Sequence, residues 1–135
     1  MAVQVLHHVN LRVHPEDIRK LRDFYCDVIG LTEGWRPPFR SSGYWLYAGD
    51  AAVVHLVENG PDSVEADIEY GRSVIDHVAF RCSDSEGMAA RLHEHGIRYT
   101  ISEVPELGDL QFLFRDPLGN GVELSFSKPA VARDS

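Results

Sequence analysis

Four residues with metal-binding side chains stand at matching positions in two halves of this 135-residue chain: His8, His55, His77 and Glu123. The sequence around His8 reappears in outline around His77, 69 residues later (77 − 8). The sequence that leads to His55 reappears before Glu123, 68 residues later (123 − 55). A duplicated unit whose first and last strands carry these side chains predicts one metal site, here called the metal cup, assembled by pseudo-twofold symmetry.

The chemistry of these side chains indicates an open, reactive site rather than a structural one. Imidazole and carboxylate groups suit Zn, Ni, Co, Mn or Fe(II), and a ligand set without thiolate argues against structural zinc. Four protein ligands leave positions of a six-coordinate ion for water or substrate, which is the condition for metal catalysis. The alternative is that each histidine is a surface or hydrogen-bonded strand residue. Their repeat-related positions favour the metal.

The strand that follows His8 carries two further polar candidates, Asn10 and Arg12, on the same face. The positions between them are apolar, which is the period-two pattern of a half-buried strand. Arg12 has two interpretations: it anchors an anionic part of the substrate, or it pairs with a nearby acid. His7 should face the opposite side from His8 and is not assigned to the site. Trp45 belongs either to the core of a hairpin or to the wall of a pocket.

Hydrophobic periodicity and turn residues predict the order β-α-β-β-β in each half. The first half has a strand over 5–13, a helix from Pro15 to Gly30, and strands over 31–36, 44–49 and 52–58. The second half has a strand over 74–82, a helix that ends at Gly96, and strands over 98–103, 110–115 and 121–127. Ser83 and Glu86 form a candidate capping box for the second helix. We therefore predict the α+β class, with two paired βαβββ modules forming a curved mixed sheet around the metal cup.

The whole chain, residues 1–135, is predicted to be a single domain, because each half is too small to be secure alone. Its two repeats cover about 4–58 and 73–127. The segment 59–72 lacks periodicity and is interpreted as a linker. Residues 128–135 are expected to form a loose tail.

Composition excludes several classes of protein. With 44% hydrophobic and 25% charged residues, the chain is typical of a soluble globular protein. It has no apolar run long enough to cross a membrane and no signal segment, so we expect a cytoplasmic protein without a membrane partner. Two cysteines, Cys26 and Cys82, are too few for a disulfide framework and should be reduced. A formal net charge of −8 disfavours nucleic acid, which leaves a small molecule as the expected partner.

Motifs at four places in the chain resemble one known family. They are His8-x-x-Leu11-x-Val13, Phe24-Tyr25, Ile29-Gly30-Leu31 and Asp116-Pro117-x-Gly119-x-x-x-Glu123. Together with the paired modules, these motifs resemble the vicinal oxygen chelate superfamily over residues 5–127. That family includes glyoxalase I, extradiol dioxygenases, methylmalonyl-CoA epimerase and the fosfomycin-resistance transferases. The resemblance implies the same two-module fold, one divalent metal ion per site at the four residues of the metal cup, and a homodimer.

The resemblance to glyoxalase I implies an enzyme, a lactoylglutathione lyase-like lyase or isomerase. Such an enzyme binds two vicinal oxygens of a small substrate to the metal and acts through an enediolate, for which Glu123 is the expected base. Arg12 and Asn59 match the positions that hold the glutathione carboxylate in glyoxalase I. Asn10, on the face of Arg12, is the third expected substrate-binding residue.

Two departures from glyoxalase I keep other chemistries open. His55 stands where the bacterial enzyme usually has glutamate, and Ser73 stands where it has a basic residue. The first alternative is an Fe(II)- or Mn(II)-dependent extradiol-type dioxygenase that acts on a catechol-like diol. The second is a non-catalytic small-molecule or antibiotic-binding resistance protein, a class that includes bleomycin-binding homologues, which commonly lack these ligands. Fosfomycin transfer is disfavoured by acidic residues before the last hairpin: Glu103, Glu106 and Asp109.

Overall fold

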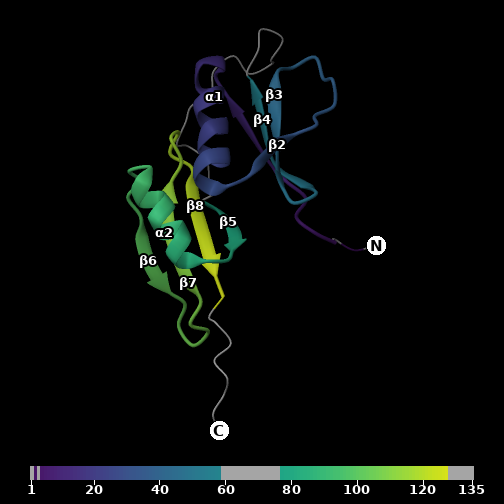
Figure 1. Ribbon diagram of the computed structural model, residues 1–135. Helices are drawn as coiled ribbons and strands as arrows, with labels where there is room; N and C mark the ends of the chain where they lie inside the picture. The colour runs from purple at the N-terminus through teal and green to yellow at the C-terminus, as the bar shows by residue number, and fades with distance from the viewer. Residues whose placement is uncertain (1, 3, 59–76, 128–135) are drawn as a thin grey trace. The chain divides into compact units, whose positions relative to one another are not determined.

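The computed structural model describes residues 2, 4–58 and 77–127 (Figure 1). The chain divides into two compact units, Met1–Glu69 and Tyr70–Ser135. Both units have the element order β-α-β-β-β, and each contains one four-stranded mixed sheet. The predicted α+β class and the two βαβββ modules are therefore confirmed. The predicted linker at 59–72 and tail at 128–135 lie outside the described residues, and the single domain stays a prediction.

The sheet of the first unit has the strand order β1-β4-β3-β2. Its strands are β1 (Val9–Val13), β2 (Thr32–Gly34), β3 (Gly43–Ala48) and β4 (Ala51–Glu58). The first and last strands, β1 and β4, pair in parallel, whereas β4, β3 and β2 form an antiparallel series. Parallel neighbours need a long crossover, and the helical segment between β1 and β2 begins that crossover. The predicted strands over 44–49 and 52–58 therefore belong to one sheet, and the predicted first helix belongs to its crossover.

One face of this sheet packs against the helix α1 (Pro15–Asp23), which lies along it in Figure 1. Burial follows the alternation of the strands, since every second side chain points toward the helix. The buried side chains on the two sides are Val13, Leu46, Val54 and Leu56 from the strands and Ile18 and Leu21 from α1. The opposite face of the sheet is left for the polar positions of β1 and β4.

The predicted first helix is correct in extent, but its second half is a π-helix, η1 (Phe24–Ile29). The carbonyl of Tyr25 accepts hydrogen bonds from the amides of Gly30 at 3.1 Å and Leu31 at 2.9 Å, which makes the turn wider than an α-turn. Four of its six residues are buried: Phe24, Tyr25, Val28 and Ile29. Gly30 ends the segment with φ of 97°, a left-handed conformation that glycine adopts without strain.

The second unit repeats this topology with the strand order β5-β8-β7-β6. Its strands are β5 (His77–Cys82), β6 (Thr100–Glu103), β7 (Leu110–Arg115) and β8 (Gly121–Phe126). β5 and β8 pair in parallel, and the remaining pairs are antiparallel. The helix α2 (Ser85–Glu94) lies across one face of the sheet in Figure 1 and buries Leu92 completely. The core also contains Phe112, Phe114, Val122, Leu124 and Phe126.

The capping box predicted for α2 is wrong in its residues. The N-cap is Asp84, whose Oδ1 accepts a hydrogen bond of 3.0 Å from the amide of Gly87. The helix begins at Ser85, so the side chain that reaches an amide of the first turn comes from Asp84 and not from Ser83. Asp84 adopts a left-handed conformation with φ of 61°, which aspartate tolerates better than most residues.

Strand register places the two halves of the predicted site in equivalent surroundings. His55 lies between Asn10 on β1 and Trp45 on β3. Glu123 lies between Ala79 on β5 and Leu113 on β7. In both units the candidate ligand therefore stands on an inner strand of the sheet, on the face opposite the helix. Across the described ranges, no helix is long and apolar enough to span a membrane.

Candidate functional site

The first unit brings two of the predicted ligands into ring contact. The imidazoles of His8 and His55 are stacked, with centroids 3.9 Å apart and planes at 14°. His8 directly precedes β1, whereas His55 is on β4 and is 8% exposed. His55 Nε2 lies 3.0 Å from the carbonyl oxygen of Ala52, which fixes the orientation of the ring. The pair is therefore anchored through its buried member.

One further ring stacks on this pair, and another meets it edge-on. The indole of Trp45 lies flat on His55, with 4.1 Å between centroids and 9° between planes. On the other side, the Nδ1 atoms of His7 and His8 lie 2.9 Å apart. The prediction that His7 faces away from His8 is wrong, because both residues precede β1 and do not follow its alternation. Trp45 belongs to the wall of a cavity, one of its two predicted places.

The electrostatic surroundings keep His55 in the form that binds metal ions. Burial lowers the pKa of the His55 imidazole, and the positive field of His8 lowers it further. The hydrogen bond to Ala52 opposes these effects in part. A lowered pKa means that the ring is neutral near pH 7, and only the neutral ring can donate a nitrogen lone pair to a metal.

The second unit brings the other two predicted ligands together. His77 Nε2 lies 3.7 Å from Glu123 Oε1. Gln111, on β7, donates a hydrogen bond of 3.1 Å from Nε2 to the same carboxylate oxygen. The Glu123 side chain is 14% exposed, and the His77 side chain is 42% exposed. Glu123 is thus held in place from β7, while His77 stands in a more open position at the start of β5.

The donor chemistry of these pairs fits a divalent ion. Two ligands at about 2.1 Å from one ion lie roughly 3.0–3.5 Å apart, close to the His77–Glu123 separation. The nearly parallel rings of His8 and His55 direct their in-plane lone pairs side by side, so one ring must turn before both can bind the same ion. Within the described part of the chain, no three His, Cys, Asp or Glu residues are grouped closely enough to hold a metal. The four-residue metal cup therefore remains a prediction.

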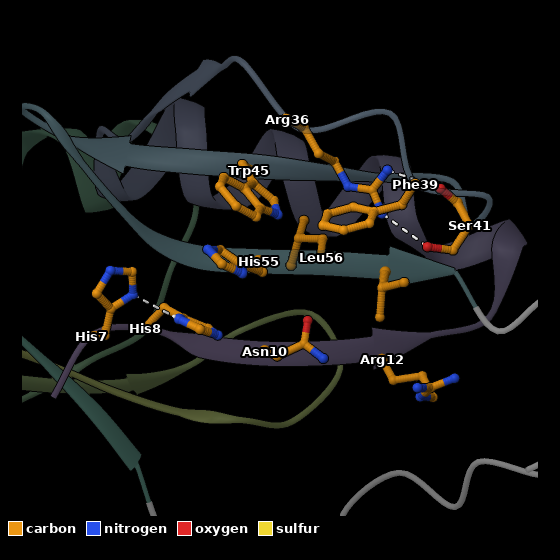
Figure 2. Close-up of a pocket in the computed structure, with 11 residues that line it drawn as sticks. His7, His8, Asn10, Arg12, Arg36, Phe39, Ser41, Trp45, His55 and Leu56 are labelled. Carbon is orange, nitrogen blue, oxygen red and sulfur yellow. Dashed lines mark hydrogen bonds between the residues drawn. The ribbon is translucent and has the colours of Figure 1, made fainter.

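A cavity of about 460 Å³ opens on the polar face of the first sheet (Figure 2). The expected substrate-binding residues Asn10 and Arg12 both line it, together with the predicted ligands His8 and His55. Figure 2 shows the stacked rings toward one end of β1 and Arg12 toward the other. Asn59, the third expected substrate-binding residue, lies outside the described residues.

The residues predicted from the sequence do not include the loop between β2 and β3, which supplies Arg36, Phe39 and Ser41 to the cavity. Arg36 donates from Nη1 to the Ser41 carbonyl at 2.9 Å and from Nη2 to Ser41 Oγ at 3.0 Å. Its guanidinium carbon lies 5.0 Å from the centroid of the Phe39 ring. The Arg36 Nε atom is buried and has no hydrogen-bond partner among the described residues. The loop could have been assigned to a binding site from its content of tryptophan, arginine and phenylalanine, because surface loops are usually polar.

A turn between β7 and β8 sets the start of the strand that carries Glu123. Asp116 is 4% exposed, and its Oδ1 accepts hydrogen bonds of 2.9 Å from the amides of Leu118 and Asn120. Its Oδ2 accepts a further bond of 2.7 Å from Asn120 Nδ2. Gly119 takes φ of 92° within the turn. The buried Asp116 carboxylate thus stabilises the turn through hydrogen bonds to two of its residues.

Comparison with protein families gives one match that covers most of the chain. The model of the Glyoxalase/Bleomycin resistance protein/Dioxygenase superfamily matches residues 5–124. No curated protein matches the chain.

Solved structures with the same fold come from several bacteria. A glyoxalase family protein from Bacillus anthracis is 22% identical, with a TM-score of 0.73 over 95% of this chain and 98% of that one. Lactoylglutathione lyase from Agrobacterium tumefaciens is 21% identical, with a TM-score of 0.61 over 87% and 91%. A fosfomycin resistance protein from Listeria monocytogenes is 17% identical, with a TM-score of 0.63 over 95% and 97%. At these identities the likeness shows the fold, and one fold hosts different activities.

Proposed function

Because the chain belongs to the Glyoxalase/Bleomycin resistance protein/Dioxygenase superfamily, we propose that it is a metal-dependent lyase or isomerase of the glyoxalase I type. Its substrate would be a small molecule that presents two vicinal oxygens. The proposed ligands are His8, His55, His77 and Glu123. One observation carries the proposal: each unit brings two ligand-type side chains together on the sheet face opposite its helix.

The proposed residues divide the chemistry among themselves. A divalent ion held by the metal cup (Zn, Ni, Co, Mn or Fe(II)) would polarise the substrate oxygens and acidify the neighbouring carbon. Glu123 is the proposed base, which accepts a proton from that carbon and returns it to the adjacent carbon. The hydrogen bond from Gln111 orients its carboxylate for this transfer. His55 contributes a neutral imidazole because its pKa is lowered by burial.

Substrate binding is assigned to three residues. Arg12 would hold an anionic part of the substrate, since it lines the cavity on the strand that follows His8. Asn10 lines the same cavity and lies beside His55 in the strand register, where its amide can bond to a substrate oxygen. Asn59 is proposed as the third contact on the family resemblance alone.

The metal content of the purified protein tests the ligand assignment. We expect one ion per site in the wild type, and loss of most of this metal in His77→Ala. His93→Ala, which removes an exposed histidine from α2, is the matched control and should keep the metal. Equal metal content in wild type and His77→Ala would contradict the proposed site.

The second candidate is an extradiol-type dioxygenase that uses Fe(II) or Mn(II). Two histidines and one carboxylate are the ligand set of many non-haem iron oxygenases. The indole of Trp45 and the ring of Phe39 in the cavity wall offer contacts for a catechol ring. A substrate panel with metal replacement separates the candidates: hemithioacetal turnover supports the lyase, and Fe(II)-dependent oxygen uptake with catechols supports the dioxygenase. Binding without turnover under any metal would indicate a non-catalytic binding protein.

A homodimer is the proposed assembly. The two sheets end in β1 and β2 in one unit and in β5 and β6 in the other, and such edge strands present unpaired backbone groups that favour association. Light scattering at micromolar concentration should give twice the chain mass. A monomer under these conditions would contradict the assembly.

A further inference from the structure

The cavity of the first unit has an aromatic corner, formed by Phe39, Trp45 and His55. His55 and Trp45 lie flat against each other at 4.1 Å. The Phe39 ring stands 6.2 Å from Trp45 at a tilt of 46°. These rings come from the β2–β3 loop, β3 and β4, and all three line the cavity (Figure 2). Rings at such separations and tilts offer both faces and edges to a further ring.

Part of this aromatic surface is open to solvent. Phe39 is 54% exposed, although Arg36 is fixed over its ring by two hydrogen bonds to Ser41. Exposing a phenylalanine ring to water is unfavourable, and an ordered loop that does so beside a cavity is typical of a binding site. The cavity of about 460 Å³ is within the range of small-molecule sites, roughly 300–1,000 Å³.

The charge of the cavity lining is opposite to that of the protein. The chain has 21 acidic and 13 basic residues. Among the described residues that line the cavity, two are arginines, Arg12 and Arg36, and none is aspartate or glutamate. A cationic lining in an acidic protein favours an anionic ligand.

We propose that this cavity binds a small aromatic carboxylate, with its ring in the aromatic corner and its carboxylate on Arg12. This inference rests on the proposed function and deepens it, because it names the substrate class of the same site. The ring would gain aromatic contacts from Phe39 and Trp45, and the carboxylate would gain a charge-assisted hydrogen bond from the guanidinium. Both contacts come from the first unit alone.

Calorimetric titration of the full chain with three matched probes tests the proposal. The probes are 3-phenylpropanoate, 3-cyclohexylpropanoate, which lacks the ring electrons, and 3-phenylpropanamide, which lacks the charge. We expect the phenyl acid to bind about two- to tenfold more tightly than the cyclohexyl acid. We expect the phenyl acid to bind at least about tenfold more tightly than the amide. Equal affinity within either pair, or no binding of the phenyl acid at millimolar concentration, would overturn the proposal.

Two variants with matched controls locate the contacts. Phe39→Leu should remove the preference for phenyl over cyclohexyl, whereas Trp35→Leu, at a 70% exposed ring in the same loop that does not line the cavity, should keep it. Arg12→Met should remove the preference for carboxylate over amide, and Arg19→Met on α1 should keep it. If Phe39→Leu changes the oligomeric state and leaves the preference intact, a second copy covers the corner and the proposal is wrong.

The same titrations on chelator-treated protein separate this inference from the proposed function. Loss of metal from His77→Ala reports on the ligands, whereas the phenyl preference of metal-free protein reports on the aromatic corner. Unchanged metal in His77→Ala with an intact phenyl preference overturns the metal cup and supports the aromatic site. Loss of metal from His77→Ala with no phenyl preference supports the metal cup and overturns the aromatic site.

Discussion

Gln111 donates a hydrogen bond of 3.1 Å to the Glu123 oxygen that also lies 3.7 Å from His77 Nε2. The two residues stand on neighbouring strands, β7 and β8, in a diagonal relationship, since Glu123 is registered with Leu113. Diagonal neighbours are within reach of a long side chain such as glutamine. One residue on a neighbouring strand therefore orients the carboxylate proposed as both ligand and base.

Removing this hydrogen bond should weaken metal binding without abolishing it. For Gln111→Leu we expect about a 10- to 100-fold loss of affinity, the usual effect of losing a partner that orients a metal ligand. Competition with a chelator of known affinity measures the change. Ser102→Ala, at the position registered with Gln111 on β6, is the control and should bind as the wild type does. Wild-type affinity in Gln111→Leu would show that the hydrogen bond is unimportant for the site.

Arg12 and Glu123 should have separable kinetic effects once a substrate is known. Arg12→Met should raise KM with kcat less affected, because the charge serves binding; Arg19→Met on α1 is its control. Glu123→Gln should chiefly lower kcat, because the amide cannot accept the proton. Steady-state kinetics on the three variants makes the comparison. If Arg12→Met keeps full catalysis and lowers the melting temperature, Arg12 is a structural ion-pair partner instead.

Asp116 should be the most sensitive position of the β7–β8 turn. Asp116→Ala leaves two backbone amides and the Asn120 side chain without their acceptor, which should lower the free energy of unfolding by about 2–4 kcal/mol. Asp116→Asn keeps one carbonyl acceptor and should cost less. Urea denaturation provides the values. Asp50→Ala in the exposed β3–β4 turn is the control, and a similar loss there would remove the special role of Asp116.

Both cysteines should react slowly with alkylating reagents. Burial raises the pKa of the Cys26 thiol and of the Cys82 thiol. A raised pKa lowers the thiolate fraction at any given pH, so the curve of alkylation rate against pH should be shifted to higher pH than that of free cysteine. Iodoacetamide labelling followed by mass spectrometry between pH 7 and pH 10 checks this, with urea-unfolded protein as the fast reference. A native curve that coincides with the unfolded one would refute the prediction.

The fold was predictable because its signals are local and occur twice. Alternating apolar residues predict strands in both halves, as Val9, Leu11 and Val13 do in the first. Gly30 marks the end of the first helical segment. The π-helical turn at Phe24–Ile29 was not predictable, because its four buried residues fit an ordinary helix equally well. The N-cap was misplaced by one residue, since Ser83 and Asp84 both have suitable side chains.

The positions of the candidate ligands were predictable only where these residues sit on strands. His55 and Glu123 stand as their repeat positions suggested, each on an inner strand. Sequence spacing could not predict the cavity wall, because Arg36 and Phe39 belong to a loop whose path depends on the Ser41 hydrogen bonds. His7 was missed for a related reason: period-two alternation does not apply before the first residue of β1.

The parallel pairing of first and last strands determines when each unit can fold. Val9 is registered with Val54, and His77 is registered with Gly121, so β1 and β5 have no parallel partner until the end of their unit has been synthesised. Pairing over such sequence distances raises contact order and delays folding. The strands that complete the two sheets, β4 and β8, are those that carry His55 and Glu123. A nascent chain therefore acquires each pair of proposed ligands only after the last strand of that unit has been synthesised.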